Sequence, residues 1–336
     1  MELNRTTLSD FVKLADVIFL KEIDSLGMEA RNSGLFNVEA ISQNTGNTRE
    51  FSEIDLEEYA RKKGEGDQAA RAKVQQGYSK TLTSYRVALD IGITYEMRTQ
   101  NKYTDVVRRL TNLAKQAVNR MELDLSHRFT FGTATTYTNM EGETIDIKTG
   151  DSLQLFYSAH TVRGVSTTYR NRLANNPQVS RGAIEGMEKL AVEETINQFG
   201  EKKVMPFDIL WTTDDPNAVN TVKEYLNSTA TPESGQNAGV VNVYRAKYKH
   251  VVLPRVATTA AGAVDSTKRK YWGIASSAYS SAYLGVWEEP HLKTPAALNA
   301  GEEFATDDWN FGVRAGYGIV IVDAKWIKMS SGDGTA

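Results

Sequence analysis

The side chains that most often perform catalysis are few in this chain and lie far apart. Its four histidines, His127, His160, His250 and His291, are each more than thirty positions from the next, and it has no cysteine. A locally encoded zinc motif or catalytic pair needs such residues within a few positions of one another. We therefore expect core or surface histidines, with His160 forming structural hydrogen bonds. The alternative is a hydrolase in which His160 works with an aspartate and a serine brought close by folding.

Three acidic residues, Glu53, Asp55 and Glu57, alternate along a segment that has the pattern of a β-strand. Because successive side chains of a strand point to opposite faces, all three would lie on one face. There they could bind a cation or act as an acid–base pair. They could equally be solvated charges that deter wrong strand pairing.

A third interpretation of these charges is contact between identical chains. Residues 49–59 carry a net charge of −4 and residues 61–77 a net charge of +3. Opposite charges at an interface guide register and specificity. The other interpretation of residues 61–77 is a soluble loop. We predict that the intersubunit contacts are made by Glu53, Asp55, Glu57, Arg61, Lys62, Lys63, Arg71 and Lys73.

The sequence contains no motif that predicts an enzyme. The stretch GEGDQAAR, which starts at Gly64, lacks the Gly-Lys-Ser/Thr end of a phosphate-binding loop and follows no buried strand. Neither Gly-x-Ser-x-Gly nor His-Glu-x-x-His occurs. We predict no catalytic residue, no cofactor and no metal site.

The bulk composition limits the class of protein. With 40% hydrophobic residues, a chain of 336 residues can bury a substantial core, and its length suggests roughly two domains. The net charge of −3 and the pI near 5.9 argue against a dedicated nucleic-acid-binding protein, which is usually basic. No signal-peptide pattern is present, and no apolar run reaches the ~20 residues that span a bilayer. We expect a soluble protein made in a reducing compartment.

A long two-stranded arm is the most unusual predicted element. Apolar and polar residues alternate over Tyr85–Met97, and Thr48–Tyr59 also has the pattern of a strand, with the charged stretch Ala60–Gly77 between them. A strand over Tyr78–Met97 would extend ~65 Å, whereas a compact body of this chain length is ~50 Å across. The arm would overhang its own body unless it bends at Gly92. Because an isolated two-stranded ribbon is marginal in water, we expect another chain to cover it.

The remaining pattern predicts an α+β protein. The helix with the longest apolar stripe covers Thr104–Phe129 and is far longer than an average globular helix. Other helices are expected after Thr7, from Ser180 to Gly200 and after Pro216. The other expected elements are a loosely ordered strap over Asn37–Asn47, a hairpin over Thr135–Lys148, and strands over Met205–Trp211, Val240–Arg245, Tyr248–Leu253, Arg269–Ile274, Ala282–Trp287 and Phe311–Lys328.

Two stretches of sequence, and the order of these elements, resemble a known family. GDSLQLFYSAHTVRGVSTTYRNRLANNPQVSRGAIEGMEKL, Gly150–Leu190, has a Leu-Phe pair, a following His, an Asn-rich segment and a Ser that opens a helix. KVMPFDILWTTDDPNAVNTVKEYL, Lys203–Leu226, has a strand followed by a helix. Both are similar to the major capsid proteins of tailed bacteriophages, which have the Hong Kong 97-type fold. The likeness covers essentially the whole chain.

The resemblance implies a division of the chain into an N-terminal arm (1–47), an extended hairpin or E-loop that lies over the adjacent subunit (48–97), a peripheral domain (98–206 and 301–336) with a spine helix at about 104–129, and an axial domain (207–300). It implies a structural protein, a major capsid protein that self-assembles into the icosahedral shell around the phage double-stranded DNA. Its location would be the virion, with assembly in the host cytoplasm. The nearest alternative is the shell protein of an encapsulin-type nanocompartment, which has the same fold.

The resemblance also implies partners. These are many copies of the chain in pentamers and hexamers, a portal, DNA held without sequence specificity and, in some members, decoration proteins; no membrane is implied. Some members carry a scaffolding segment that a protease removes, whereas the first helix predicted here begins close to Met1, which favours a separate scaffold protein or assembly without one. Some members join subunits by a lysine–asparagine bond. The arm holds Lys62, Lys63, Lys73 and Lys80, but the sequence singles out no asparagine partner, and we do not expect cross-linking.

Overall fold

The structure, a computed structural model, describes residues 5–42, 46–55, 59–71, 75–100, 103–231, 240–294 and 308–334. The fold is α+β, as predicted. Its helices are α1 (Arg5–Ser25), α2 (Tyr95–Thr99), α3 (Tyr103–Thr130), α4 (Arg181–Glu193) and α5 (Pro216–Asn227). None of the described helices has a stretch long and apolar enough to cross a membrane.

The described strands form two four-stranded sheets and three two-stranded ones. The first large sheet has the order β1 (Asn37–Ala40), β12 (Ala282–Lys293), β13 (Trp309–Ile321) and β4 (Tyr85–Ile93). The second has the order β10 (Lys249–Val252), β9 (Ile209–Thr212), β11 (Trp272–Ala275) and β14 (Ile327–Ser330). The pairs are β2 (Thr48–Asp55) with β3 (Gln75–Thr83), β5 (Thr136–Thr138) with β6 (Thr144–Asp146), and β7 (His160–Val162) with β8 (Val165–Tyr169).

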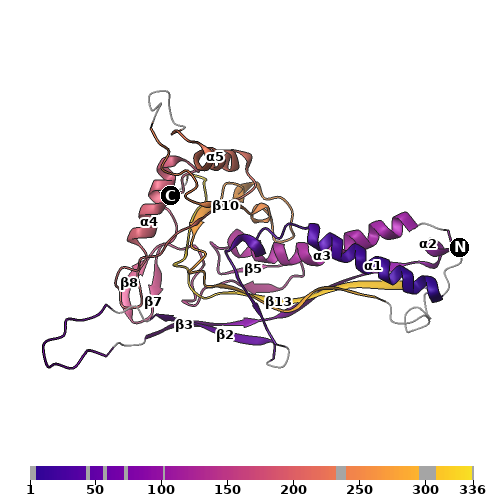
Figure 1. The fold of residues 1–336 in the computed structure, drawn as a ribbon, viewed down its shortest axis with the longest axis horizontal. Coiled ribbons are helices and arrows are strands. Elements are labelled where there is room, and N and C mark those ends of the chain that lie inside the picture. Colours follow the sequence, from indigo (N-terminus) through magenta and orange to yellow (C-terminus); the bar gives the residue numbers. More distant parts are fainter. Residues whose placement is uncertain are drawn as a thin grey trace.

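The long helix α3 lies along one face of the first sheet and forms the main core with it (Figure 1). Its apolar stripe, which includes Leu110, Met121 and Leu125, is buried. The stripe faces the inward side of β13, where Phe311 and Tyr317 are buried. Helix α1 packs on α3 as well. The helix predicted over Thr104–Phe129 is thus confirmed to within one residue at each end.

Three of the four strands of the second sheet are buried on both faces, and the edge strand β10 is partly exposed. Every residue of β9, β11 and β14 is buried, because the main core lies on one side and helices α4 and α5 on the other. Local sequence starts both helices. The Ser180 hydroxyl accepts a hydrogen bond from the Ala183 amide at the start of α4, and Pro216 occupies the first turn of α5, where its missing N–H costs nothing.

The predicted arm differs from the observed one. The strand pattern over Tyr78–Met97 breaks at Ser84: β3 pairs with β2, whereas β4 pairs with β13 over nine residues and belongs to the first sheet. After β4 the chain turns into α2, whose first turn is capped by the Thr94 hydroxyl. The projecting ribbon is therefore β2–β3, and the prediction that it reached Met97 is wrong. Period-two alternation does not reveal which strand is the partner.

Several smaller predictions also need correction. The strap over Asn37–Asn47 contains strand β1. No strand forms in Val240–Arg245, where a single bridge joins Val241 to Ala230 and turns follow. Helix α4 ends at Glu193, before Gly200. The closing strand is two strands in different sheets, β13 and β14, because the chain turns between them. The hairpin over Thr135–Lys148 is confirmed, with Gly142 at a positive φ in its turn.

The expected domain boundaries stay a prediction. They place β12 in the axial domain and its hydrogen-bonded partner β13 in the peripheral domain. They also place β14 apart from β11, with which it pairs.

We predict that the folded chain loses stability at acid pH through His127. Burial lowers the pKa of this side chain to about 4 from the ordinary value of 6.5; its ring is packed edge-on against Phe131 and Tyr137. Between these pH values the unfolded chain binds a proton that the folded chain does not, so the free energy of unfolding falls as the pH falls, by at most ~3 kcal/mol.

Replacing His127 with Phe should reduce this loss, measured as urea unfolding at pH 7 and pH 4.5. Part of the loss should remain, because burial also lowers the pKa of His250 to about 4. An identical acid loss in the variant and the parent chain would contradict the prediction.

Candidate functional site

The most exposed extended feature in the described part of the chain is the arm, which we define as residues 48–55, 59–71 and 75–83. Figure 1 shows its ribbon running beneath the body and its tip, residues 59–71, projecting past β7 and β8. At the base of the tip the Tyr59 hydroxyl donates to the Lys202 carbonyl at 3.1 Å. Every described residue of the tip is exposed. The tip contains no helix or strand, and a turn lies at Glu65–Gly66.

An apolar cluster fixes the root of the arm. Phe51 of β2 and Leu82 of β3 are buried against Val320, near the end of β13, and Val322, just after it. The Phe51 ring stacks on Tyr283 of β12, with 4.2 Å between ring centroids. Burying side chains of this size contributes about 1.5–3 kcal/mol each, so the root is held firmly on the first sheet.

An ion pair sits beside this cluster. Glu53 of β2 lies opposite a bulge in β3, where Gly77 and Tyr78 stand against this single residue, and its carboxylate accepts a hydrogen bond from Lys325 Nζ at 2.6 Å. Lys325 is 3% exposed. Burial and the neighbouring carboxylate of Asp323 raise the pKa of Glu53, and the attraction of Lys325 opposes them. The pair ties the arm to the segment that joins β13 and β14.

Further contacts hold strand β3 to the body. The Arg163 guanidinium donates to the Gly77 carbonyl at 3.2 Å, and the hydroxyls of Tyr78 and Thr161 are 3.0 Å apart. The Lys80 ammonium donates to a backbone carbonyl, and burial lowers its pKa to about 8. The root is fixed on several sides, and the tip extends from it.

The structure separates the predicted contact residues into two groups. Glu53 is at the root, in an ion pair within its own chain. Arg61, Lys62, Lys63 and Arg71 share the exposed tip. Asp55 ends β2, and its side chain is not described; Glu57 and Lys73 lie outside the described residues. Contact of these residues with another subunit stays a prediction.

Sequence reasoning missed the residues that hold the root. Lys325 lies 272 positions from Glu53, and Arg163 lies 86 positions from Gly77. No local spacing connects such pairs. The one available signal was the presence of Lys325 and Lys328 in a run of buried residues. A buried ammonium needs a partner, so such a lysine indicates a contact with a distant carboxylate or carbonyl.

His160 is a structural residue, as expected. It is fully buried, its Nδ1 lies 2.8 Å from an Asp151 carboxylate oxygen, and its Nε2 lies 3.2 Å from the Leu155 carbonyl oxygen. Burial acts to raise the pKa of Asp151, but the hydrogen bond and charge of His160 outweigh it and the pKa lies below its usual range. Both ring nitrogens therefore have acceptors, and neither is available as a base toward a substrate. No group of three or more potential metal ligands occurs in the described part of the chain.

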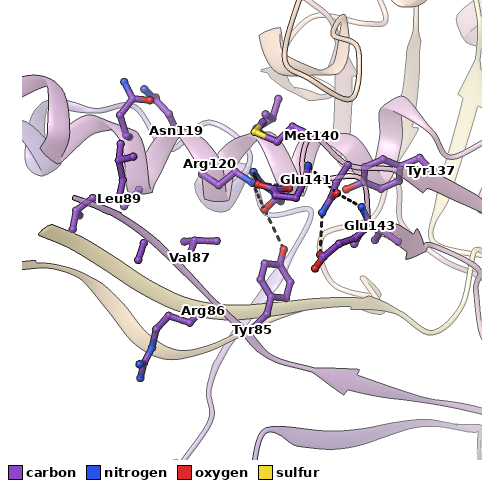
Figure 2. Close-up of a pocket in the computed structure, with 18 residues that line it drawn as sticks. Tyr85, Arg86, Val87, Leu89, Asn119, Arg120, Tyr137, Met140, Glu141 and Glu143 are labelled. Carbon is purple, nitrogen blue, oxygen red and sulfur yellow. Dashed lines mark hydrogen bonds and ion pairs between the residues drawn. The ribbon is translucent and has the colours of Figure 1, made fainter. Parts of the chain in front are cut away.

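A groove of about 650 Å³ lies between α3, β4 and the β5–β6 hairpin (Figure 2). Val87 and Leu89 of β4 line it on one side, while Met140 and Glu141 of the hairpin turn lie on the other. Arg120 of α3 crosses it: its guanidinium bonds Asp124 at 3.0 Å and Glu141 at 2.5 Å. The hydrogen bond from Arg120 lowers the pKa of Glu141. The groove combines apolar walls with fixed carboxylates.

The sequence matches no protein-family profile and no curated protein. The structure is similar to solved structures at low identity. One from Mycobacterium phage Ogopogo is 12% identical, with a TM-score of 0.44 over 88% of this chain and 89% of that one. A virus-like particle from Pyrococcus furiosus is 12% identical, with a TM-score of 0.47 over 95% and 98%. The capsid of cyanophage P-SCSP1u is 10% identical, with a TM-score of 0.47 over 88% and 85%.

We predict that Lys325→Met loosens the arm root. The change leaves the Glu53 carboxylate beside Asp323 without the ammonium that offsets its burial, and removing one partner of a buried pair costs roughly 3–5 kcal/mol. Urea unfolding and amide hydrogen exchange in β2 and β3 would measure the loss.

The matched control is Lys189→Met, which breaks an exposed pair with Glu193 on α4 and should cost less than ~1 kcal/mol. The double variant Glu53→Gln/Lys325→Met should recover most of the loss. Equal small effects of Lys325→Met and Lys189→Met would show that the ion pair does not hold the arm.

Proposed function

We propose that the chain is a major capsid protein, which self-assembles into the icosahedral shell of a tailed bacteriophage. The observation that carries the proposal is the arm, whose root is fixed on its own body while every described residue of its tip is exposed. The body fixes the direction of the arm, but no described part of the chain buries the tip. Such a tip is suited to contact with a neighbouring copy of the chain.

The arrangement of the other elements supports the same proposal. The Hong Kong 97-type fold implies an N-terminal helix, an extended hairpin, a long spine helix, a middle α/β region and a returning strand. Helix α1, the β2–β3 ribbon, helix α3, the sheet around β9 and strand β13 occur in this order. We propose that α3 is the spine helix and that the β2–β3 ribbon, rather than all of residues 48–97, is the E-loop.

The first helix also has a surface suited to a neighbour. Ala15 and Phe19 of α1 are buried toward the core, whereas Val17 and Leu20 are 62% and 63% exposed. Two apolar side chains one turn apart on the outer face add to the surface that copies could share. Many small contacts of this kind, repeated by the symmetry of a closed shell, together make the shell stable.

The finer assignments form part of the proposal. Residues 207–300 would meet their copies in pentamers and hexamers, and residues 98–206 with 301–336 would form the peripheral domain. The mechanism would be assembly rather than catalysis, in a virion built in the host cytoplasm. A separate scaffold protein, a portal and decoration proteins would be partners, and packaged DNA would be contacted without sequence specificity, largely through counterions.

An encapsulin-type compartment is the second candidate. One observation favours it: two cations in the first half of α3 pair with carboxylates, Arg108 with Asp105 and Lys115 with Glu22. If α3 lines the interior, this pairing reduces its attraction for DNA. The contents of purified particles, nucleic acid or protein, distinguish the two candidates.

We predict that deleting Arg61–Arg71 leaves a folded chain that forms no closed shells. The deletion removes the exposed tip but keeps β2, β3 and the apolar root. Light scattering and electron microscopy of the purified protein would show small species in place of particles.

The control is Lys189→Ser, which removes an exposed cation from α4 and should leave particles unchanged. Circular dichroism should match the parent chain for both variants. Normal particles from the deletion variant would refute the assignment of the arm to intersubunit contact.

A further inference from the structure

Strand β4 is an edge strand with a free side. It pairs with β13 along one side, and no other described strand pairs with it. The strand is nine residues long. An edge of this length presents a row of backbone N–H and C=O groups that an extended segment of another chain can pair with.

The groove beside this edge has a distinctive chemistry. Its walls include Leu89 and Met140, each 49% exposed, so apolar surface is open to an occupant. Its charged residues are Asp124, Glu141 and Glu143 with Arg86 and Arg120, a net charge of −1. The Arg86 side chain points away from the groove (Figure 2), where it pairs with Glu288.

Side chains that match both properties are those of lysine and arginine. Their aliphatic stems cover apolar surface while their charged ends reach carboxylates at the rim. Glu143 and Glu141 lie at the hairpin turn, beside Met140. An extended segment with closely spaced cations would therefore place stems on the apolar wall and charges on these two residues.

The chain itself contains such a segment. The arm tip, residues 59–71, has four cations and two carboxylates, a net charge of +2, and it is exposed throughout. Between Tyr59 and Gly64 it has no regular secondary structure, so its backbone can pair with an edge strand. Within one chain the tip projects away from the β5–β6 hairpin (Figure 1), so the occupant must come from a second copy.

We propose that the groove between β4, α3 and the β5–β6 hairpin is the receptor for the arm tip of a neighbouring copy. The tip adds its backbone along the free edge of β4, and its lysine and arginine side chains pack on Leu89 and Met140 and pair with Glu141 and Glu143. This inference rests on the proposed function, because it requires the neighbour that a shell provides.

Cross-linking can test this contact cleanly, because the chain has no cysteine of its own. The test variant carries Lys63→Cys in the tip and Met140→Cys at the groove, two exposed positions. A short bismaleimide added to assembled particles should join chains into a ladder of covalent oligomers on denaturing gels. The yield should fall at least several-fold when Glu141 and Glu143 are both replaced with Lys.

The control variant carries Lys63→Cys with Val241→Cys. Val241 is exposed, forms a bridge with Ala230 just after α5 and does not line the groove. The control variant and each single-cysteine variant should remain largely monomeric on the gel. Particles that form normally, with no more cross-linking in the test variant than in the control, would overturn the groove assignment and leave the proposed function intact. A parent chain that forms no particles would overturn both.

Discussion

The packing of the arm root against the first sheet is the interaction that determines how the arm projects from the molecule. A two-stranded ribbon has too little buried surface to be stable alone. Here Phe51 and Leu82 bury their side chains against residues near the end of β13 and just after it, and the Glu53–Lys325 pair adds a directed polar link. Because the root is anchored by both kinds of contact, the direction in which the tip projects is set by the body.

That body is organised by the pairing of α3 with the sheet it covers. The apolar stripe of α3 and the inward residues of β13 form one continuous core. Polar groups join the same layers: Asp124 of α3 accepts hydrogen bonds from the hydroxyls of Tyr85 on β4 and Tyr317 on β13. Burial and the nearby Asp124 carboxylate raise the pKa of Tyr85, which keeps this phenol a neutral donor. The helix, the central strand and the edge strand are thereby held in one fixed arrangement, which also shapes the groove.

The parts of this fold that could be read from the sequence are those encoded by local spacing. The stripe of α3 repeats every three to four residues, Ser180 caps α4, and Gly142 permits a tight turn. The partner of β4 was not predictable in this way, because strict alternation over Tyr85–Met97 is equally consistent with a projecting ribbon and with a strand inside a sheet. The bulge in β3 opposite Glu53 and the pairing of Glu53 with Lys325 were not predictable for a related reason. Both depend on contacts between segments far apart in the chain, and a single sequence does not display those contacts.

The order of the strands in the first sheet has a consequence for synthesis. Its central strand, β13, comes from residues 309–321 and lies between β12 and β4, and the arm root rests on Val320, Val322 and Lys325. A chain still growing on the ribosome has made its arm long before it makes the surface on which the arm rests. Pairing across such a separation is slow to form because the loop must first close. The arm of an unfinished chain therefore has no surface to pack against, and its direction is fixed only after residues 309–325 have been synthesised and folded.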